Sequence, residues 1–347
     1  MTRFIYQQQP ARIIFGYPIL KALTEEVSNA ASANLWVIAS HRFDSLVQQI
    51  DELESVNVLE HFSRVLQHVP HDQVQKARHA VAKSNPDIIL AIGGGSAIGL
   101  AKAVALKHQI PIWAVPTTYS GSEMTNIYGI SSGKEKSVGR SDKVIPGCVF
   151  YDPELSITLS KRAAAASAIN ALAHLVEAAY SPSVNPFTLH QSFEGMRIML
   201  KGLQKLAKEE ALTFETNTDL LLGACFAGKS LSEAEMGLHH KCAHVLGGSY
   251  GLDHSLVHTV LLPYVLSYQW DSLPESIKGQ FKEIFNSNSP AQSLLNLIDQ
   301  LGLPASLKSI GFNKSDAAEA ASKVVELDFR NPAPVTQQSV QALLENA

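Results

Sequence analysis

Apolar and polar positions alternate in blocks over the first half of the chain. Three apolar runs, at residues 35–39, 87–92 and 112–115, have the length of strands and are separated by more polar stretches. A continuous apolar run is typical of a parallel strand that is covered on both faces. Between these runs, residues 43–54 and 72–84 place apolar side chains at helical spacing. Strands that alternate with helices predict a doubly wound α/β domain.

The pattern changes after Asp152, where the strand-like runs give way to long stretches with helical spacing. Ser160 is a suitable N-cap for a helix that begins at Lys161 and continues through the alanine-rich segment AAAASAINALAHLVEAAY. No convincing strand alternation follows. We therefore predict an α/β domain over residues 1–155 and an all-helical domain over residues 156–347. Further helices are predicted at residues 186–210, 216–235 and 255–268.

Composition and charge limit the kinds of function. The chain has 28 lysine and arginine against 32 aspartate and glutamate residues, a net charge of −4, and 17% charged residues, where about 25% is ordinary. That balance argues against partners such as nucleic acids and membranes. The N-terminus lacks a secretory signal, and three cysteines without C-x-x-C spacing suit a reducing compartment. We expect a soluble, cytoplasmic protein.

A glycine-rich turn follows one of the apolar runs. Gly93, Gly94, Gly95 and Ser96 come directly after residues 87–92, and helical spacing resumes at Ser96. Glycines let backbone N–H groups approach an anion, and a helix N-terminus attracts negative charge. The turn is therefore a candidate pyrophosphate site. A tight strand-to-helix turn without a ligand would use the same glycines, and the order GGGSAIG differs from G-x-G-x-x-G.

A second loop, rich in hydroxyl groups, follows the next apolar run. Its sequence is PTTYSGSE (116–123). The carboxyl ends of neighbouring parallel strands meet at one edge of a sheet, where open α/β sheets bind ligands. The two loops together therefore predict a ligand-binding crevice. A capping turn with Glu123 in the first turn of a helix would explain the same residues.

Histidine is concentrated in one short segment. Thirteen histidines are present and five of them lie within residues 239–258, where a uniform distribution would place fewer than one. This density argues against five unrelated core histidines. Within the segment, we expect His239 and His258 at the rim or facing solvent.

The helical domain also pairs polar residues at helical spacing. Asn170 and His174 are four residues apart, as are His240 and His244, so each pair shares a helix face. His254 follows after a turn-like stretch. Polar side chains on apolar helices need partners, which a metal, a substrate or one another can provide.

Four motifs in the same order resemble the iron-containing alcohol dehydrogenase superfamily, which is related in fold to dehydroquinate synthase. They are IGGGSAIGLAK (92–102), VPTTYSGSEMT (115–125), INALAHLVEA (169–178) and HHKCAHVLGGSYGLDHSLVHTVLLP (239–263). The shortened loop PTTYSGSE, in place of PTTAGTGSE, and the HHK run, in place of VHG, are similar to the maleylacetate reductase branch. The resemblance covers nearly the whole chain and implies a dehydroquinate synthase-like fold, with an NAD(P)-binding α/β domain and an all-helical catalytic domain.

The resemblance implies NADH or NADPH as the cofactor. The glycine-rich turn would hold the pyrophosphate, and the hydroxyl loop would line the nicotinamide side. Ser40 and Arg42, after the first strand, would lie near the adenosine ribose. No acidic residue ends that strand, and Arg42 is suited to a 2′-phosphate, so both cofactors stay open. The implied cofactor-binding residues are Gly93, Gly94, Gly95, Ser96, Thr117, Thr118, Ser120, Ser122, Ser40 and Arg42.

Metal-dependent relatives hold their ion with one aspartate and three histidines. The matching positions here are Asn170, His174, His240 and His254, and the resemblance places His244 beside the nicotinamide. A neutral amide is a poor ligand for Fe²⁺ or Zn²⁺. We therefore expect no bound metal; if an ion is captured, His174, His240 and His254 would hold it.

The reaction implied by the resemblance is reduction of the C=C bond of maleylacetate, a small dicarboxylate, to 3-oxoadipate in the catabolism of aromatic compounds. His244 and His254 are the candidates for stabilising the enolate and protonating it, and His174 and His240 for orienting the substrate. Lys241 and Arg140 are candidate cations for the two carboxylates, although Arg140 is equally explained as a solvated charge. The other predicted substrate contacts are Asn170 and Tyr119.

Three other interpretations remain. The first is a metal-dependent alcohol dehydrogenase of the same superfamily, against which Asn170 argues. The second is a lyase of the dehydroquinate synthase type, which recycles its NAD. The third, a dinucleotide-binding sensor without catalysis, does not explain the histidines. The resemblance also implies a homodimer and a cleft between domains that closes during catalysis.

Overall fold

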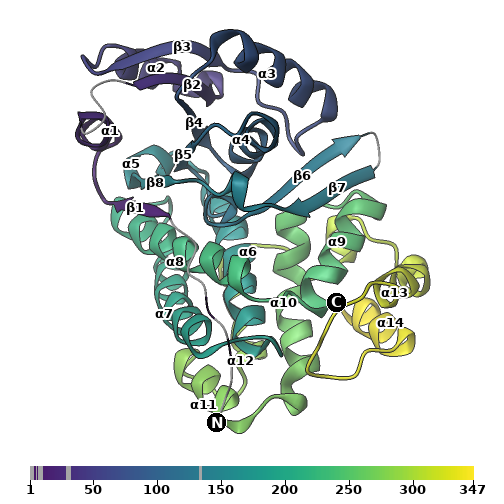
Figure 1. The fold of residues 1–347 in the computed structure, drawn as a ribbon. Coiled ribbons are helices and arrows are strands. Elements are labelled where there is room, and N and C mark those ends of the chain that lie inside the picture. Colours follow the sequence, from purple (N-terminus) through teal and green to yellow (C-terminus); the bar gives the residue numbers. More distant parts are fainter. Residues whose placement is uncertain (1–3, 5, 7–10, 29–32, 133–134) are drawn as a thin grey trace. The chain divides into compact units, whose positions relative to one another are not determined.

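The structure is a computed structural model that describes residues 4, 6, 11–28, 33–132 and 135–347. It divides into two compact units (Figure 1). The first, an α/β unit, ends at Thr158; the second, a helical unit, begins at Leu159 and also includes Phe4. Each unit has its own hydrophobic core.

The α/β unit is built on a six-stranded parallel sheet in the order β1-β8-β5-β4-β2-β3. Successive strands are added toward one edge from β2 to β3 and toward the other edge from β4 onward, so the direction reverses between β2 and β4, as in doubly wound sheets. The prediction of a doubly wound domain is confirmed. The strands are β1 Arg12–Phe15, β2 Ala33–Ala39, β3 Val56–Phe62, β4 Ile88–Gly93, β5 Ile112–Pro116 and β8 Cys148–Tyr151. The helices are α1 Ile19–Ser28, α2 Asp44–Asp51, α3 His71–Ser84, α4 Gly95–His108 and α5 Pro153–Ser156.

Both faces of this sheet are covered by helices. Leu35 and Val37 of β2 pack with α1 and α2, whereas Trp36 and Ile38 of the same strand pack with α3 and α4. Successive side chains of a strand point to opposite faces. A strand buried on both faces therefore consists of apolar residues throughout, which explains the continuous runs in the sequence.

A short antiparallel hairpin follows the hydroxyl loop, which contains the 3-10 turn η2 Ser122–Met124. Its strands are β6 Ile127–Ser132 and β7 Glu135–Arg140, and Ile127 pairs with Arg140. The sequence analysis did not predict this hairpin. A further 3-10 turn, η1 His41–Phe43, follows β2.

The helical unit contains no strand in residues 159–347, all of which are described. Ser160 accepts a hydrogen bond from the Ala163 N–H at 3.3 Å, so the predicted cap of the first long helix is confirmed. That helix, α6, is buried along most of its length. The long helices are α6 Lys161–Tyr180, α7 Pro186–Lys208, α8 Phe214–Glu233, α9 Leu238–Tyr250, α10 His254–Gln269, α11 Glu275–Ile284, α12 Pro290–Gln300, α13 Ala317–Val325 and α14 Gln337–Asn346.

Two local signals end α9 and begin α10. Gly251 has φ +68°, a left-handed conformation that stops a helix and that glycine adopts without strain. The Asp253 carboxylate then accepts a hydrogen bond from the Leu256 N–H at 3.0 Å and caps α10. His254 is therefore the first residue of α10. In the described ranges, no helix is both long and apolar enough to cross a bilayer.

Candidate active site

The glycine turn and the hydroxyl loop meet at the carboxyl ends of β4 and β5. A Cβ added at Gly94 would lie 2.9 Å from the Thr118 side chain, and one at Gly95 would lie 3.3 Å from the Ser120 Oγ. A side chain at Gly94 would clash with Thr118, and one at Gly95 would be a tight contact. The structure therefore brings together the two predicted halves of the dinucleotide-binding crevice.

The backbone reinforces this contact. The Thr117 N–H donates to the Gly93 carbonyl at 3.0 Å, and Gly93 has φ +150°, which favours glycine. Gly94 is the N-cap of α4, and among the described residues no side chain caps that helix. The N-terminus of α4, with Gly95 and Ser96 in its first turn, is thus a suitable place for an anionic group.

The predicted adenosine contacts lie after β2, the neighbour of β4 in the sheet. Ser40 is half-buried and precedes the 3-10 turn η1. Arg42 is exposed; its Nη2 donates to the Leu155 carbonyl at 3.4 Å, and its guanidinium lies 4.5 Å from the centre of the Phe43 ring. Their contact with a ribose stays a prediction.

Two residues of the hydroxyl loop lie deeper than their predicted roles require. The Tyr119 side chain is fully buried, and burial raises the pKa of its hydroxyl. This disfavours the predicted contact with substrate. Glu123, which the alternative interpretation places in the first turn of a helix, lies in the first turn of the 3-10 helix η2; its fully buried carboxylate accepts a hydrogen bond from the Tyr151 hydroxyl at 2.9 Å. The hydrogen bond to Tyr151 holds Glu123 against β8.

Arg140 is the last residue of β7 and is exposed. Its Nη1 donates to the Asn126 Oδ1 at 3.1 Å. The planar guanidinium of an arginine matches a carboxylate in geometry and charge. Its predicted contact with substrate stays a prediction.

The helical unit gathers six histidines from three helices. His174 lies on α6, one turn after Asn170, and its ring stacks on that of His240 from α9 with the ring centres 5.0 Å apart. Both rings and the Asn170 amide are buried. Asn170 and His174, which are four residues apart in the sequence, therefore lie in the same site. The other members of this histidine cluster are His239, His244, His254 and His258.

Four buried polar atoms of this histidine cluster and Asn170 have no hydrogen-bond partner among the residues that the structure describes. They are the Asn170 Oδ1, the His174 Nδ1, the His239 Nδ1 and the His240 Nε2. An unsatisfied buried polar group costs on the order of 1–3 kcal/mol. Such atoms mark the place where a bound molecule would supply the missing partners.

His239 and His258 are fully buried, so their expected position at the rim is wrong. The His239 Nε2 lies 2.7 Å from the His258 Nδ1, and the His258 Nε2 lies 3.2 Å from the His254 Nε2. The three rings thus form a chain of hydrogen bonds from the core to His254. Helical spacing gave no indication of this, because it does not reveal which flank of α9 packs against α10.

The outer members of the cluster are His244 and His254, which are both exposed. Their rings are nearly parallel, with centres 6.4 Å apart. The cluster therefore has a buried layer and an exposed pair. An exposed imidazole can exchange protons with a ligand and with solvent, as general acid–base catalysis requires.

Glu177 is a site residue that the sequence analysis missed. It lies three residues after His174 on α6, is buried, and accepts hydrogen bonds from the N–H groups of His239 at 2.8 Å and His240 at 3.3 Å. Its carboxylate also contacts the His240 Nδ1. Gly237, the N-cap of α9, has no side chain, so Glu177 performs the capping role from another helix. One signal in the sequence could have identified Glu177: it is a single acidic residue within an otherwise uncharged, alanine-rich stretch.

Burial sets the protonation state of the buried layer of the cluster, which we call the inner layer and which consists of His174, His239, His240 and His258. It lowers the pKa of His174 and His239 to about 3, and neighbouring histidines act in the same direction. Burial likewise lowers the pKa of His240 and His258 well below the ordinary range. It raises the pKa of Glu177 to about 7. The inner histidines are therefore neutral near pH 7 and offer hydrogen bonds without a charge.

Lys241 is half-buried, with its ammonium 5.9 Å from the centre of the Phe329 ring. Its charge also favours the ionised form of Glu177 and so opposes the rise in that pKa. It follows His240 directly on α9 and therefore points to a different flank of the helix. Its contact with a substrate carboxylate stays a prediction.

The predicted metal ligands are a poor match for a resident ion, and the absence of a metal stays a prediction. Among the residues that the structure describes, no group of three or more histidine, cysteine, aspartate or glutamate side chains is arranged to hold one. The fourth candidate ligand, Asn170, is a neutral amide, so the site offers no anionic ligand to Fe²⁺ or Zn²⁺. We derive no catalytic step through a metal.

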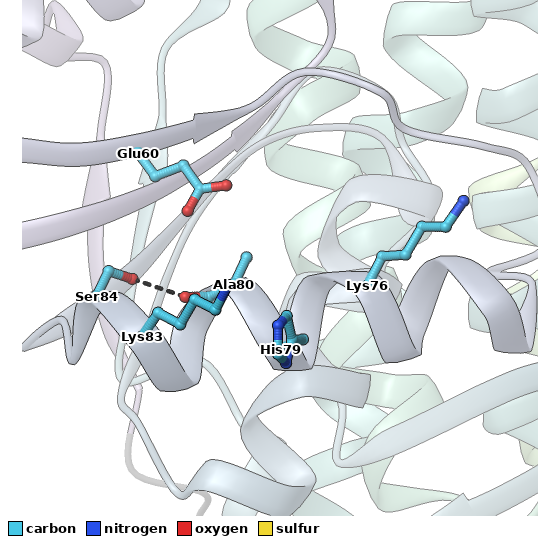
Figure 2. Close-up of a pocket in the computed structure, with 6 residues that line it drawn as sticks. All are labelled: Glu60, Lys76, His79, Ala80, Lys83 and Ser84. Carbon is cyan, nitrogen blue, oxygen red and sulfur yellow. Dashed lines mark hydrogen bonds between the residues drawn. The ribbon is translucent and has the colours of Figure 1, made fainter.

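An open pocket of about 480 Å³ lies elsewhere, on the surface of the α/β unit (Figure 2). Glu60 of β3 faces it from one side and Lys76, His79 and Lys83 of α3 from the other, while Ser84 donates to the Ala80 carbonyl at 3.1 Å. It contains none of the predicted site residues. Its exposed lysines form a solvated helix face, the ordinary place for such charges.

Comparison with known proteins places the chain in a family. A model described as iron-containing alcohol dehydrogenase matches residues 10–153, and one described as the C-terminal part of the Fe-containing alcohol dehydrogenase family matches residues 164–347. Maleylacetate reductase from Pseudomonas sp. strain P51 is 35% identical over 99% of this chain and 97% of that protein. Maleylacetate reductase 1 from Rhodococcus opacus is 35% identical over 100% of this chain and 96% of that protein.

Solved structures agree with this assignment. Maleylacetate reductase from Rhizobium sp. strain MTP-10005 superposes with a TM-score of 0.93 at 31% identity, covering 100% of this chain and 98% of that one. An iron-containing alcohol dehydrogenase from Corynebacterium glutamicum gives 0.92 at 34% identity, covering 99% and 96%. The resemblance drawn from the four motifs is confirmed. The chain belongs to the iron-containing alcohol dehydrogenase family of oxidoreductases.

Proposed function

We propose that the chain is a maleylacetate reductase that reduces the C=C bond of maleylacetate to 3-oxoadipate with NADH or NADPH. One observation carries the proposal beyond the family. Asn170 takes the place of the acidic metal ligand, and its buried Oδ1 lacks a partner, as do the His174 Nδ1 and the His240 Nε2, among the described residues. An uncharged, hydrogen-bonding pocket suits a polar organic substrate better than a dication.

The proposed cofactor site is the paired loop of the α/β unit. The N-terminus of α4 would receive the pyrophosphate, and the loop hydroxyls of Thr118 and Ser120, packed against Gly94 and Gly95, would line the nicotinamide side. The reduced cofactor supplies a hydride to the alkene carbon remote from the ketone. Because no acid ends β2, we propose that both cofactors are accepted.

The helical unit supplies the proton chemistry. As hydride adds, negative charge collects on the ketone oxygen, and the carbon next to the ketone must then receive a proton. We assign these roles to the exposed pair His244 and His254. The hydrogen bond between the Nε2 atoms of His258 and His254 orients the His254 ring.

The inner layer orients the substrate. His174 and His240 are held neutral by burial and keep a buried nitrogen available for a ligand's polar groups. Lys241 and Arg140 are the proposed partners of the two carboxylates. A cation near each carboxylate would fix which alkene carbon faces the hydride donor.

The proposal is tested by following the oxidation of NADH, and separately of NADPH, with maleylacetate as substrate. We expect turnover that is unchanged after treatment with a chelator. Rapid turnover of simple alcohols that is lost on chelation would instead establish the metal-dependent alcohol dehydrogenase. A lyase would transform its substrate without net consumption of NADH.

The expected assembly and location are also proposals. We propose a cytoplasmic homodimer that acts on a small dicarboxylate, with no role for nucleic acid or membrane. Light scattering of the purified protein tests the oligomeric state directly. A monomer at catalytic concentrations would contradict it.

A further inference from the structure

A fully buried lysine lies next to the proposed cofactor loops. Lys102 is on α4, two turns after the glycine turn, and its side chain is 0% exposed. Its ammonium donates to the carbonyls of Ser122 at 2.5 Å, Thr125 at 2.7 Å and Ile127 at 3.0 Å, and it lies 2.9 Å from the Thr125 Oγ1. One cation therefore engages four oxygen atoms.

All four oxygens belong to a single segment. Ser122 lies near the end of the hydroxyl loop that contacts the glycine turn, and Thr125 lies between that loop and the hairpin. Ile127 begins β6 and pairs with Arg140, the proposed substrate cation. Lys102 thus ties residues 122–127 to the helix whose N-terminus receives the pyrophosphate.

This arrangement is unfavourable for the lysine itself. Burial lowers the pKa of Lys102 to about 7, and the negative charge of Glu123 opposes that change. Transfer of an ammonium out of water costs several kcal/mol even with compensation. Methionine would fill a similar space without this cost but would leave the carbonyls of Ser122, Thr125 and Ile127 without this donor. The contribution of the lysine therefore lies in the backbone segment that it holds.

We propose that Lys102 is a positioning residue that holds the segment 117–127 against the Gly94–Gly95 turn and thereby sets the affinity for the dinucleotide. It does so without contacting the ligand. A backbone held by four hydrogen bonds keeps Thr118 and Ser120 at the glycine turn before the cofactor arrives. Such preorganisation lowers the ordering cost of binding. The inference rests on the proposed cofactor site.

Lys102→Met tests the proposal through the dissociation constant of NADH, measured by fluorescence titration well below the melting temperature. We expect binding to weaken about tenfold or more, because loop misplacement is costly, while kcat at saturating NADH changes much less. Lys107→Met is the matched control, since Lys107 is exposed on the same helix. A lower melting temperature with unchanged NADH affinity would overturn the proposal.

Two further variants keep the test decisive if Lys102→Met folds poorly. Thr125→Val removes one acceptor and leaves the lysine its three carbonyls; we expect NADH binding to weaken about two- to fivefold. The double variant Lys102→Met/Glu123→Gln also removes the carboxylate charge of Glu123, which faces Lys102 in the wild type. If that double variant regains wild-type NADH affinity, Lys102 only neutralises Glu123 and the clamp is refuted.

The wild-type titration separates this inference from the proposed function. If the wild type binds neither NADH nor NADPH, the proposed function fails. If the wild type binds and both Lys102→Met and Thr125→Val match its affinity, only the role of Lys102 fails.

Discussion

The α/β unit and the helical unit bury polar groups in different ways. In the α/β unit, the buried Lys102 engages four oxygens and faces the buried Glu123, so a charge is enclosed and compensated by fixed partners. In the helical unit, burial keeps the inner histidines neutral, and the Asn170 Oδ1 has no partner in the described part of the chain. A buried charge with fixed hydrogen-bond partners holds the backbone that it contacts. Buried neutral groups without such partners can form hydrogen bonds to a ligand. We therefore propose that the α/β unit holds a loop in place and that the helical unit binds and protonates the substrate.

The largest expected effect concerns the exposed histidines. His254→Ala should lower kcat by about 10²- to 10⁴-fold, the ordinary contribution of a general acid, and leave the dissociation constant of NADH unchanged. Steady-state kinetics and NADH titration check the two parts. His79→Ala, an exposed histidine of the α/β unit, is the control. An unchanged kcat in His254→Ala would remove this residue from the mechanism.

A smaller effect is expected from the carboxylate that caps α9. Glu177→Ala leaves the N–H groups of His239 and His240 without their acceptor and should lower the free energy of unfolding by about 1–3 kcal/mol. The loss of orientation at His240 should also reduce kcat by about tenfold or more. Glu177→Gln keeps an amide oxygen for these donors and should recover most of the stability. Equal stability of both variants would show that the cap is unimportant.

The glycine turn provides a test in the α/β unit. Gly94→Ala places a Cβ 2.9 Å from Thr118, so we expect NADH affinity to fall by about tenfold. Gly95→Ala meets the Ser120 Oγ only at 3.3 Å and should have a smaller effect. Gly279→Ala in α11 has no neighbour within 4 Å and should stabilise the protein by about 0.5–1 kcal/mol. Equal NADH affinity of all three variants would refute the loop contact.

The weakest expected effect is a pH dependence of stability. The pKa of His174 and His239 is about 3 in the folded protein and near 6.5 when unfolded. The unfolded state binds more protons between these values, so the free energy of unfolding falls as the pH drops from about 6.5 towards 3. Glu177, whose pKa is raised to about 7, acts in the opposite direction above about pH 4.5.

Denaturant titrations at pH 7 and pH 5 measure this fall. We expect a loss on the order of 1 kcal/mol for each buried histidine, and a smaller loss in His239→Gln than in the wild type. His79→Gln should follow the wild type, because His79 is exposed. Identical losses in all three proteins would contradict the neutral inner layer.

Structural elements that depend on local residue type and spacing are predicted well from the sequence. The strand runs, the glycine turn and the Ser160 cap follow from residue type and spacing, because a buried parallel strand, a close approach and a helix start each demand particular residues. The resemblance extends this to the family and its proposed cofactor loops.

Contacts between distant segments were not predictable in the same way. Lys102, Glu177 and the pair His239 and His258 look ordinary in the sequence, and only tertiary packing brings each to its partners. The hairpin of β6 and β7 was not predicted because its strands contain many polar residues and glycines and no continuous apolar run. Spacing along one helix cannot show which flank meets another helix.

The central claim is that this member of an iron-containing family reduces maleylacetate without iron. The most direct measurement is the rate of NADH oxidation with maleylacetate before and after exhaustive chelation, with the metal content of each sample determined. The account predicts the same rate in metal-free protein. Activity that disappears with the metal and returns on addition of Fe²⁺ or Zn²⁺ would contradict it.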